Sequence, residues 1–592
     1  MPTAILTGPP VPGSPLEGDL RSLGFEVRIA AGPRDTGALL ASVPASERVA
    51  VVDSRFTGHR HALRLALTDP RFGAAAVPGA LTVQPAARPG LDRALARATA
   101  PAHSLPDELA AVIEADGTVV QRPELGTLVA AVPETRAQRE VATAAVAAVD
   151  DEAVRLRSAV KSRDGFFTTF FISPYSRYIA RWCARRGLTP NQVTTASLIT
   201  ALIAAACAAT GERTGYVAAG VLLIVSFVLD CTDGQLARYS LQYSTLGAWL
   251  DATFDRAKEY SFYAGLALGA ARGGDDVWAL ALGAMVLMTC RHVVDFAFNE
   301  ANHDATANTS PTAALSDRLD SVGWTVWARR MVILPIGERW AMIAVLTALT
   351  TPRITFYALL VGCAFGALYT TAGRVLRSLT RKAERTDRAA RALYDLTDTG
   401  PLAEAVAYVG RSRRAGAASL VFALLAVAQL GATALFVPFG GAEWAAAAGL
   451  YVLLSAVAVA RPLKGPLDWL LPPLFRAAEY GTVLVLAAKS EVNGALPAAF
   501  GLVAAVAYHH YDTVYRIRGD AGAPPHWLVR TIGGHEGRVL VTAVLATVLA
   551  RSDFPVALTA MAGFVALVVL VESIRFWVSS GAPAVHDEGE PA

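Results

Sequence analysis

Long apolar stretches constrain this chain more than any other feature. Six of them lie at about 192–210, 214–233, 247–270, 276–297, 339–352 and 354–376. Six more lie at about 416–437, 442–460, 468–488, 495–512, 537–551 and 555–578. A transmembrane helix needs about 20 apolar residues, and several of these stretches are shorter. The sequence therefore predicts a multi-pass α-helical membrane protein with twelve spans whose boundaries are approximate.

The composition agrees with this prediction and narrows the function. Of the 592 residues, 53% are hydrophobic and 17% are charged, against about 25% charged in soluble domains. The net charge of +3 gives no field suited to nucleic acid. The five cysteines form no CxxC pair, which argues against a zinc site or a disulfide framework. We therefore expect the lipid bilayer as a partner and no nucleic acid.

One acidic stretch, residues 230–255, interrupts the apolar runs. It reads Asp230-Cys-Thr-Asp233-Gly-Gln-Leu-Ala-Arg238, then eight residues, a glycine, and two acids spaced by three residues, Asp251 and Asp255. Acids spaced in this way share one helix face, and acids in membrane helices mark functional sites. Two facing helices would form a four-carboxylate box suited to Mg²⁺ or Mn²⁺. The alternative is a polar hairpin whose acids pair only with the neighbouring cations, Arg238, Arg256 and Lys258.

The same stretch resembles the signature of the CDP-alcohol phosphotransferase (CDP-alcohol phosphatidyltransferase) family, D-x2-D-G-x2-A-R-x8-G-x3-D-x3-D, at all eight fixed positions. The resemblance implies an enzyme that transfers a phosphate-bearing group from a CDP-linked donor to an alcohol and releases CMP, in phospholipid or phosphodiester biosynthesis. It implies two Mg²⁺ or Mn²⁺ ions on the four acids, with Asp255 also the general base. The residues it implies for CDP binding are Gly234, Ala237, Arg238, Ser244 and Gly247.

The expected acceptor is an inositol phosphate or a similar polyol phosphate. Basic candidates for binding it are Arg256, Lys258 and Arg291. The N-terminal extension, the segment Lys-Ser-Arg-Asp-Gly-Phe-Phe at 161–167 and the loop Leu-Pro-Ile-Gly-Glu-Arg at 334–339 resemble the inositol-phosphate-transferring branch of the family. In that branch the membrane domain is fused to a nucleotidyltransferase-like domain.

Residues 1–135 predict a cytoplasmic α/β domain with a largely parallel sheet, because short apolar runs alternate with helical stretches. The strand candidates are Ala4–Leu6, Glu26–Ile29, Val49–Val52 and Ala80–Val83, and the helix candidates are Leu16–Leu23, Arg60–Leu67 and Leu91–Ala98. The layout resembles sugar-phosphate nucleotidyltransferases. However, four prolines at 9, 10, 12 and 15 remove amide donors from the loop that would cradle phosphate. We therefore expect a degenerate domain in which Asp53 is a turn or cap residue.

Shifts in composition divide the rest of the chain. They predict a linker with a juxtamembrane interfacial helix at 136–190, the phosphotransferase domain at 191–380, a basic cytoplasmic linker at 381–415, a second membrane domain at 416–580 and a disordered tail at 581–592. Arginine-rich loops after the second, fourth and sixth spans predict that the active site and both termini face the cytoplasm of a cell-membrane protein. The first residues lack the features of a signal peptide.

The second membrane domain resembles the first. Residues 249–260 align without gaps on 469–480, with Leu471 and Phe475 in place of Asp251 and Asp255, and Arg339 corresponds to Arg538. This similarity predicts a degenerate, non-catalytic repeat that forms a pseudo-dimer within one chain, although a homodimer stays open. A twelve-span secondary transporter built from two repeats is the alternative function. Because all four acids crowd one end of one half, the enzyme is favoured.

Overall fold

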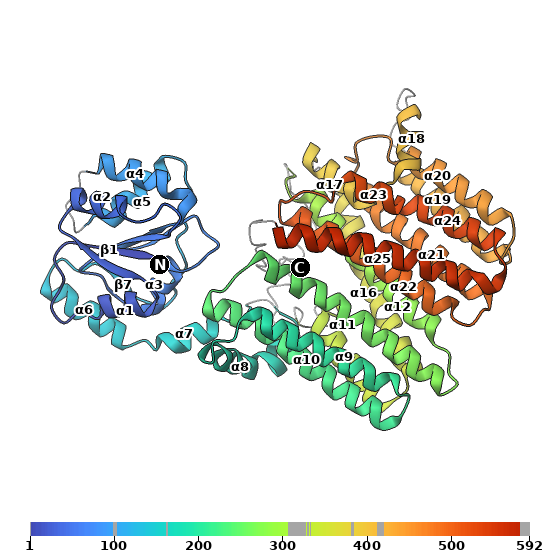
Figure 1. Cartoon of the computed structure of the whole chain (residues 1–592), viewed down its shortest axis with the longest axis horizontal. Helices are drawn as coiled ribbons and strands as arrows, with labels where there is room; N and C mark the ends of the chain where they lie inside the picture. Colours follow the sequence, from blue (N-terminus) through green and yellow to red (C-terminus); the bar gives the residue numbers. More distant parts are fainter. Residues whose placement is uncertain are drawn as a thin grey trace.

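The computed structural model describes residues 2–98, 104–161, 164–305, 333–380, 384–410 and 419–579, together with Trp327 and Met331. The predicted tail at 581–592 lies outside these residues. An α/β domain stands to one side of a large helical assembly and is joined to it through α6 (Arg136–Ala147) and α7 (Asp151–Ser158), as Figure 1 shows. One continuous hydrophobic core runs through both halves of the helical assembly.

The α/β domain is built on a five-stranded sheet in the order β2-β1-β3-β6-β5. Its strands are β1 (Thr3–Thr7), β2 (Glu26–Ala30), β3 (Val49–Asp53), β5 (Ala74–Val77) and β6 (Ala80–Val83). The first three strands are parallel, whereas β6 runs antiparallel to both β3 and β5. Pro78 and Gly79, with φ +77° at the glycine, turn β5 directly back into β6. The α/β class is confirmed, but the sheet is parallel only in part.

Helices cover both faces of this sheet. They are α1 (Leu16–Ser22), α2 (Pro33–Ala41), α3 (Arg60–Leu67), α4 (Arg88–Arg97) and α5 (Leu105–Ala115). Leu40, Leu91 and Leu109 contribute to the core on one face, and Leu16 and Leu63 contribute to the core on the other. A short second sheet pairs β4 (Thr57–Gly58) with β7 (Ala130–Ala131).

The first half of the helical assembly contains one helix for each of its six predicted spans. After α8 (Ser173–Arg185) come α9 (Pro190–Ala209), α10 (Arg213–Ser240), α11 (Thr245–Arg272), α12 (Trp278–Asn302), α15 (Ile336–Leu349) and α16 (Pro352–Thr380). Helix α9 begins with a capping box in which Thr189 accepts a hydrogen bond from the Gln192 amide, and Pro190 occupies the first turn. Helix α10 ends at Leu241, whose left-handed backbone (φ 54°) breaks the helical hydrogen-bond pattern.

The second half also contains one helix for each predicted span. These are α19 (Ser419–Phe436), α20 (Glu443–Ala458), α21 (Leu471–Ser490), α22 (Ala495–Arg518), α24 (Gly534–Val548) and α25 (Phe554–Ser579), with the short α23 (His526–Ile532) before α24. Within the predicted basic linker lie α17 (Asp387–Thr397) and α18 (Pro401–Gly410). Helix α17 packs on α12 and α21, and α18 packs on α20 and α24.

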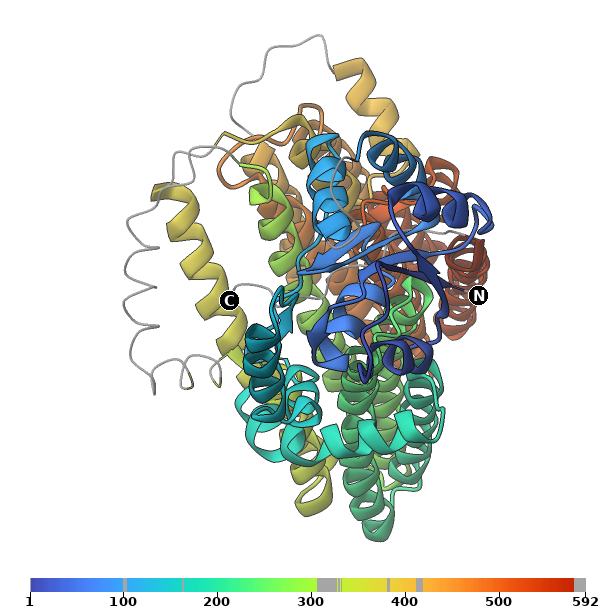
Figure 2. The ribbon, with the colours of Figure 1, turned by 90° about the vertical axis from the view of Figure 1, so that its left-hand side faces the viewer.

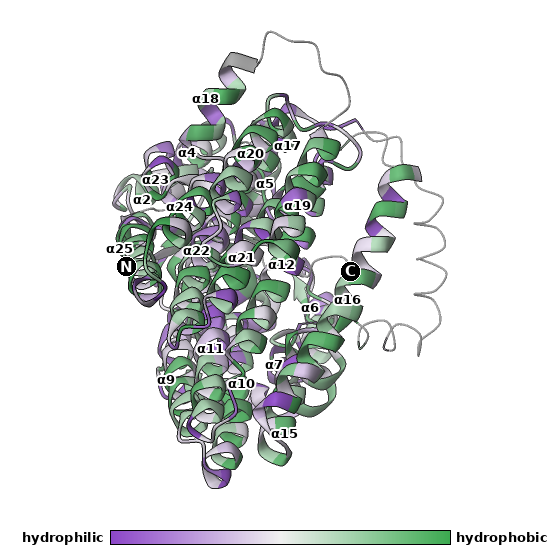
Figure 3. Ribbon diagram, turned by 90° about the vertical axis from the view of Figure 1, so that its right-hand side faces the viewer, coloured by the Kyte–Doolittle hydropathy of each residue, from purple (hydrophilic) through white to green (hydrophobic). Residues whose placement is uncertain are grey.

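Seven of the described helices are long and apolar enough to cross a membrane. These seven helices are α9, α10, α12, α16, α19, α21 and α25. Helix α16 stands at the edge of the bundle in Figures 2 and 3 and exposes Val361, Phe365 and Leu368. Exposed apolar side chains along such a helix fit contact with lipid chains. Membrane character is therefore confirmed, whereas the count of twelve spans stays a prediction.

Candidate active site

The carboxylates of the acidic stretch meet between two neighbouring helices. Helix α10 carries Asp230 and Asp233, and α11 carries Asp251 and Asp255. One carboxylate oxygen from each of Asp230, Asp233 and Asp251 lies within 4.8 Å of the others. Both helices pack on α9, which fixes their relative position. Three of the four predicted ligands thus form one cluster of oxygen atoms.

The fourth acid, Asp255, joins this cluster through a buried lysine. The Lys258 ammonium lies 2.9 Å from Asp255 Oδ1 and also contacts Asp230 Oδ1. It donates a further hydrogen bond to Ser197 Oγ at 3.2 Å and is completely buried. The lysine, predicted as an acceptor-binding residue, therefore balances the negative charge of the cluster.

The cluster fits a hard divalent cation. Asp233 Oδ2 is buried and has no hydrogen-bond partner among the described residues. An orphaned buried carboxylate oxygen is costly, and a metal ion is one of the few groups that satisfies it. Carboxylate oxygens are the ligands that Mg²⁺ and Mn²⁺ prefer. Asp230, Asp233 and Asp251 are therefore the residues that could hold a metal ion.

The predicted CDP-binding residues lie on the same two helices or, for Ser244, directly before the second of them. Ser244 caps α11 by accepting a hydrogen bond from the Gly247 amide at 2.9 Å. A Cβ atom at Gly247 would lie 2.8 Å from Asn191 Oδ1, so the glycine permits close approach to α9. Arg238 donates from Nε to the Ala159 carbonyl at 2.7 Å, and its guanidinium lies beside Gly234. Ala237 is half-buried next to it.

The other two predicted acceptor-binding residues, Arg256 and Arg291, contact groups outside the carboxylate cluster. Arg256 forms an ion pair with Glu259 at 2.8 Å, and both side chains are buried. Glu259 also pairs with Arg339 at 3.1 Å and accepts a hydrogen bond from Tyr263. Arg291 donates to the Ile333 carbonyl, while its second terminal nitrogen is buried with no hydrogen-bond partner among the described residues.

Sequence reasoning missed Glu259 as the centre of this ion-pair network. Its spacing of three residues from Arg256 was a usable signal, because such residues are neighbours on a helix. The contact with Arg339 joins residues 80 positions apart, and no local pattern predicts it.

In the α/β domain, Asp53 is the last residue of β3, and its side chain holds the turn that follows the strand. Asp53 accepts hydrogen bonds from the Arg55 amide at 2.8 Å and from the Arg55 guanidinium at 3.0 Å. A cavity of about 200 Å³ is bordered by the proline-rich loop, Arg55 and Arg139. The carboxyl ends of β1 and β3 open toward this cavity, where open α/β sheets commonly bind ligands.

A helical membrane domain with clustered acids on two adjacent helices is typical of a membrane enzyme. Residues 187–368 match the family model described as CDP-alcohol phosphatidyltransferase, and residues 387–592 match a family of unknown function (DUF5941). The chain therefore carries a CDP-alcohol phosphatidyltransferase domain, and the resemblance read from the acidic stretch is confirmed.

Curated relatives match over part of the same region. The archaetidylinositol phosphate synthase of Pyrococcus horikoshii is 32% identical over 113 residues, which cover 19% of this chain and 58% of that protein. The bifunctional IPC transferase and DIPP synthase of Aquifex aeolicus is 30% identical over 114 residues, 19% of this chain and 26% of that protein. The phosphatidylinositol phosphate synthase of Streptomyces avermitilis is 34% identical over 131 residues, which cover 21% of this chain and 51% of that protein. The chain thus spans 58% or less of each of these relatives.

Proposed function

We propose that this chain transfers a phosphate-bearing group from a CDP-linked donor to an alcohol acceptor and releases CMP. The cluster of Asp230, Asp233 and Asp251 is the observation that carries the proposal, because it lies inside the domain that matches the phosphatidyltransferase family. In the reaction, the acceptor oxygen forms a bond to the phosphorus atom distal to the cytidine. The pyrophosphate bond breaks, and CMP leaves with the bridging oxygen.

Each of the acidic and basic residues of the site has a separate role in this reaction. The three clustered acids, with Asp255, would hold Mg²⁺ or Mn²⁺, two ions in the full proposal, and bound ions neutralise pyrophosphate charge. Asp255 takes the proton of the acceptor hydroxyl as general base. Lys258, 2.9 Å away, stabilises the ionised form of Asp255, which is the form that accepts a proton. Arg238 and Gly247 border the expected position of the nucleotide.

The acceptor we propose is a polyol phosphate such as an inositol phosphate. The printed names of two relatives, which contain inositol phosphate synthase, favour it. The unpartnered buried nitrogen of Arg291 supports it too, because a guanidinium with a free donor suits phosphate. Phospholipid or phosphodiester biosynthesis is the matching process.

We further propose that the site faces the cytoplasm of a cell-membrane protein. The end of α10 that follows its two acids contacts both α7 and the α/β domain. Arg155 of α7 donates from Nε to the Tyr239 carbonyl at 2.8 Å, and Arg64 of α3 donates to the same carbonyl at 3.5 Å. The carboxylates therefore lie toward the side that holds the α/β domain. Because the donor is a nucleotide, a cytoplasmic site gives it direct access.

The second membrane domain is proposed to be a degenerate repeat of the first. Helix α9 packs on α10 and α11, as α19 packs on α20 and α21. Likewise α15 packs on α10 and α12 packs on α16, as α24 packs on α20 and α22 packs on α25. Glu479 pairs with Arg476 at 2.7 Å and with Arg538, as Glu259 pairs with Arg256 and Arg339. Leu471 and Phe475 occupy the positions of two lost acids, so no metal chemistry is expected there.

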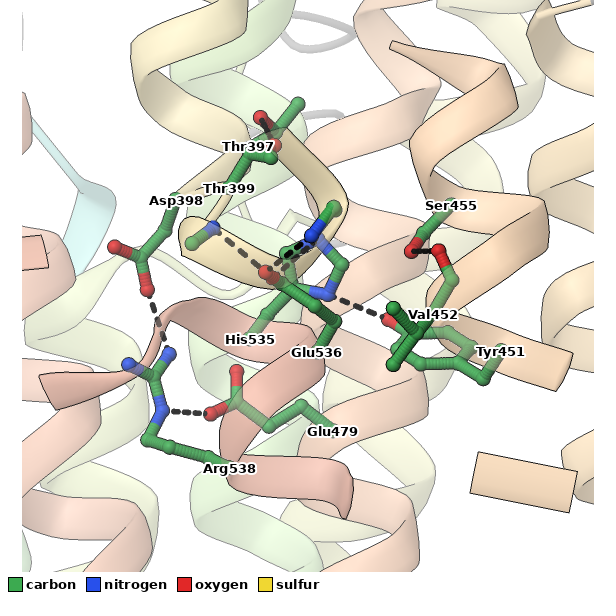
Figure 4. Close-up of polar contacts among 12 residues, drawn as sticks. Thr397, Asp398, Thr399, Tyr451, Val452, Ser455, Glu479, His535, Glu536 and Arg538 are labelled. Carbon is green, nitrogen blue, oxygen red and sulfur yellow. Dashed lines mark hydrogen bonds and ion pairs between the residues drawn. The ribbon is translucent and has the colours of Figure 1, made fainter. Parts of the chain in front are cut away.

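Figure 4 shows the ion-pair network of this second domain. Arg538 lies between Glu479 and Asp398, and the Asp398 contact is 2.6 Å long. Glu536 accepts a hydrogen bond from the Gly400 amide at 3.0 Å, next to the contact of His535 with Tyr451. In the first domain, Glu338 also accepts a backbone hydrogen bond, from the Phe167 amide at 3.2 Å, but it lies one position before Arg339 whereas Glu536 lies two before Arg538. The contacts of Glu479, Asp398 and Glu536 favour a structural role for the charges of the second domain.

The decisive experiment incubates the purified full chain with Mn²⁺ or Mg²⁺, CDP-linked donors and polyol phosphate acceptors, and measures CMP. We expect metal-dependent CMP release that Asp255→Asn lowers by about 100-fold or more, because the general base is lost. Asp275→Asn is the matched control, since Asp275 pairs with Arg353 in a loop outside the cluster. The absence of CMP with every donor and acceptor pair, or full activity in Asp255→Asn, would refute the proposal.

A further inference from the structure

The second membrane domain touches the carboxylate-bearing helix on one side of the acids. Trp577 of α25 stacks on Trp249 of α11 with ring centres 6.1 Å apart and ring planes 20° apart. Trp249 precedes Asp251 by two residues, so this contact lies within one helical turn of a cluster carboxylate. Both indole side chains are buried.

A buried charge fixes the orientation of Trp577. Its indole nitrogen donates to Asp512 Oδ1 at 2.7 Å, and Ser573 donates to the same oxygen at 2.8 Å. Arg516 lies 2.8 Å from the second carboxylate oxygen of Asp512 and stacks on Phe576. Asp512 thus holds Trp577 through a direct hydrogen bond, and Arg516 forms an ion pair with the same carboxylate. The indole therefore presents a fixed surface to Trp249.

A second contact lies on the other side of the acids. Tyr511 of α22 places its ring 5.1 Å from the guanidinium carbon of Arg256, the residue that follows Asp255. Its hydroxyl hydrogen-bonds to His292 of α12, and the two rings meet edge to face. Arg256 also forms the ion pair with Glu259. The α11 segment that carries Asp251 and Asp255 thus lies between two aromatic contacts from the second domain.

We propose that the second membrane domain positions the catalytic carboxylates. Trp577 and Tyr511 act as positioning residues that hold the segment 249–256 of α11 so that Asp251 and Asp255 face Asp230 and Asp233. The inference rests on the proposed metal-dependent function and extends it by giving the second domain a role in that site. Residues that orient metal ligands influence metal affinity, and their loss lowers that affinity by about 10-fold to 100-fold.

The test is calorimetric titration of Mn²⁺ alone into the purified full chain. We expect Trp577→Leu and Tyr511→Leu each to weaken Mn²⁺ binding by about 10-fold, and Asp251→Asn to weaken it at least as much. Tyr511→Phe retains the ring on Arg256 and should retain most of the affinity. Trp444→Leu is the matched control, because this buried tryptophan donates to the Pro438 carbonyl inside its own domain.

The outcomes separate this inference from the proposed function. Wild-type Mn²⁺ affinity in Trp577→Leu and Tyr511→Leu would overturn the positioning role, and so would an equal loss of affinity in Trp444→Leu. In either case, CMP release by the wild-type chain would still support the proposed function. No Mn²⁺ binding by the wild-type chain would remove both. If a leucine variant melts below the assay temperature, Trp577→Phe replaces it, since it keeps an aromatic ring but loses the bond to Asp512.

Discussion

At the scale of single residues, Lys258 supplies the positive charge that stabilises the carboxylate cluster when no metal ion is bound. Its ammonium is fully buried between Asp230 and Asp255. Removing one member of a buried ion pair leaves uncompensated charge and costs about 3 kcal/mol or more. We expect Lys258→Met to lower the stability of the metal-free protein by about this amount. We also expect Mn²⁺ to restore much of the loss, because the ion supplies the missing positive charge.

The measurement is thermal melting of the full chain with and without Mn²⁺. Lys489→Met serves as control, because Lys489 donates to the Val437 carbonyl in the second domain, at 2.7 Å. The expected signature is a larger Mn²⁺-induced rise in melting temperature for Lys258→Met than for the wild type or the control. Equal rises in all three proteins would contradict the role assigned to Lys258.

A second residue, His61, makes the α/β domain sensitive to acid. It is buried in α3, and neither ring nitrogen has a hydrogen-bond partner within the described ranges. Burial, with smaller effects from Arg64 and His59, lowers the pKa of His61 from 6.5 to about 4. As pH falls, the unfolded chain therefore binds a proton before the folded domain does. We therefore expect the part of the stability that depends on neutral His61 to be fully present above pH 6.5 and to fall by up to about 3 kcal/mol as pH approaches 4.

His61→Leu isolates this effect, because it removes the titrating group from an apolar site. Hydrogen exchange of peptides from α3, corrected for intrinsic rates, would be compared at about pH 7 and about pH 5. We expect acid to weaken protection more in the wild type than in His61→Leu. The same loss of protection in both proteins would assign the acid sensitivity to other groups.

Sequence spacing was enough to select the cluster residues but not the partners of each side chain. The fixed intervals between Asp230, Asp233 and Asp251 require helix faces that can meet, and they do. Lys258, which we predict to bind the acceptor, also contacts two of the acids, and the spacing did not predict this contact. Its direction depends on α9 and α10 packed around it, and local spacing carries no information about those neighbours.

At the scale of elements, the helices follow the apolar runs closely, but α10 is longer than the run that predicts it. The predicted span ends at residue 233, whereas the helix continues to Ser240. These extra turns carry Arg238 to Ala159 and Tyr239 to Glu152, with hydrogen bonds of 2.7 and 2.8 Å. The acids therefore lie inside a continuous helix that joins the membrane domain to α7. Hydropathy could not predict this, because the final turns are polar.

Strand β5 is one of the elements that the sequence did not predict. Strand β5 consists of three alanines and a valine, a composition that favours neither strand nor helix strongly. Its antiparallel pairing depends on the Pro78–Gly79 turn, so the sheet is mixed and not parallel throughout. In the predicted linker, α17 buries Leu393 and Leu396, a spacing of three residues that indicates a packed amphipathic helix.

At the scale of the whole molecule, the second membrane domain covers one face of the first, formed by α11 and α12. Helices α21 and α22 pack on α12, and α22 also packs on α11. Aromatic pairs cross this seam, with ring centres 5.7 Å apart for Trp278 and Phe500 and 5.3 Å apart for Phe298 and Trp469. The two halves share one hydrophobic core. This arrangement favours the intrachain pseudo-dimer over a homodimer that uses the same face.

We therefore expect the purified chain to be a monomer of 62.2 kDa after subtraction of bound detergent, measured by light scattering on a sizing column. Because the two halves are linked, their effective concentration is set by the chain and does not change on dilution. The rate of CMP release per mole of protein should accordingly stay constant over a broad range of protein concentration. A mass of twice this value, together with activity that falls on dilution, would show that a second copy completes the site and that the internal seam is not sufficient.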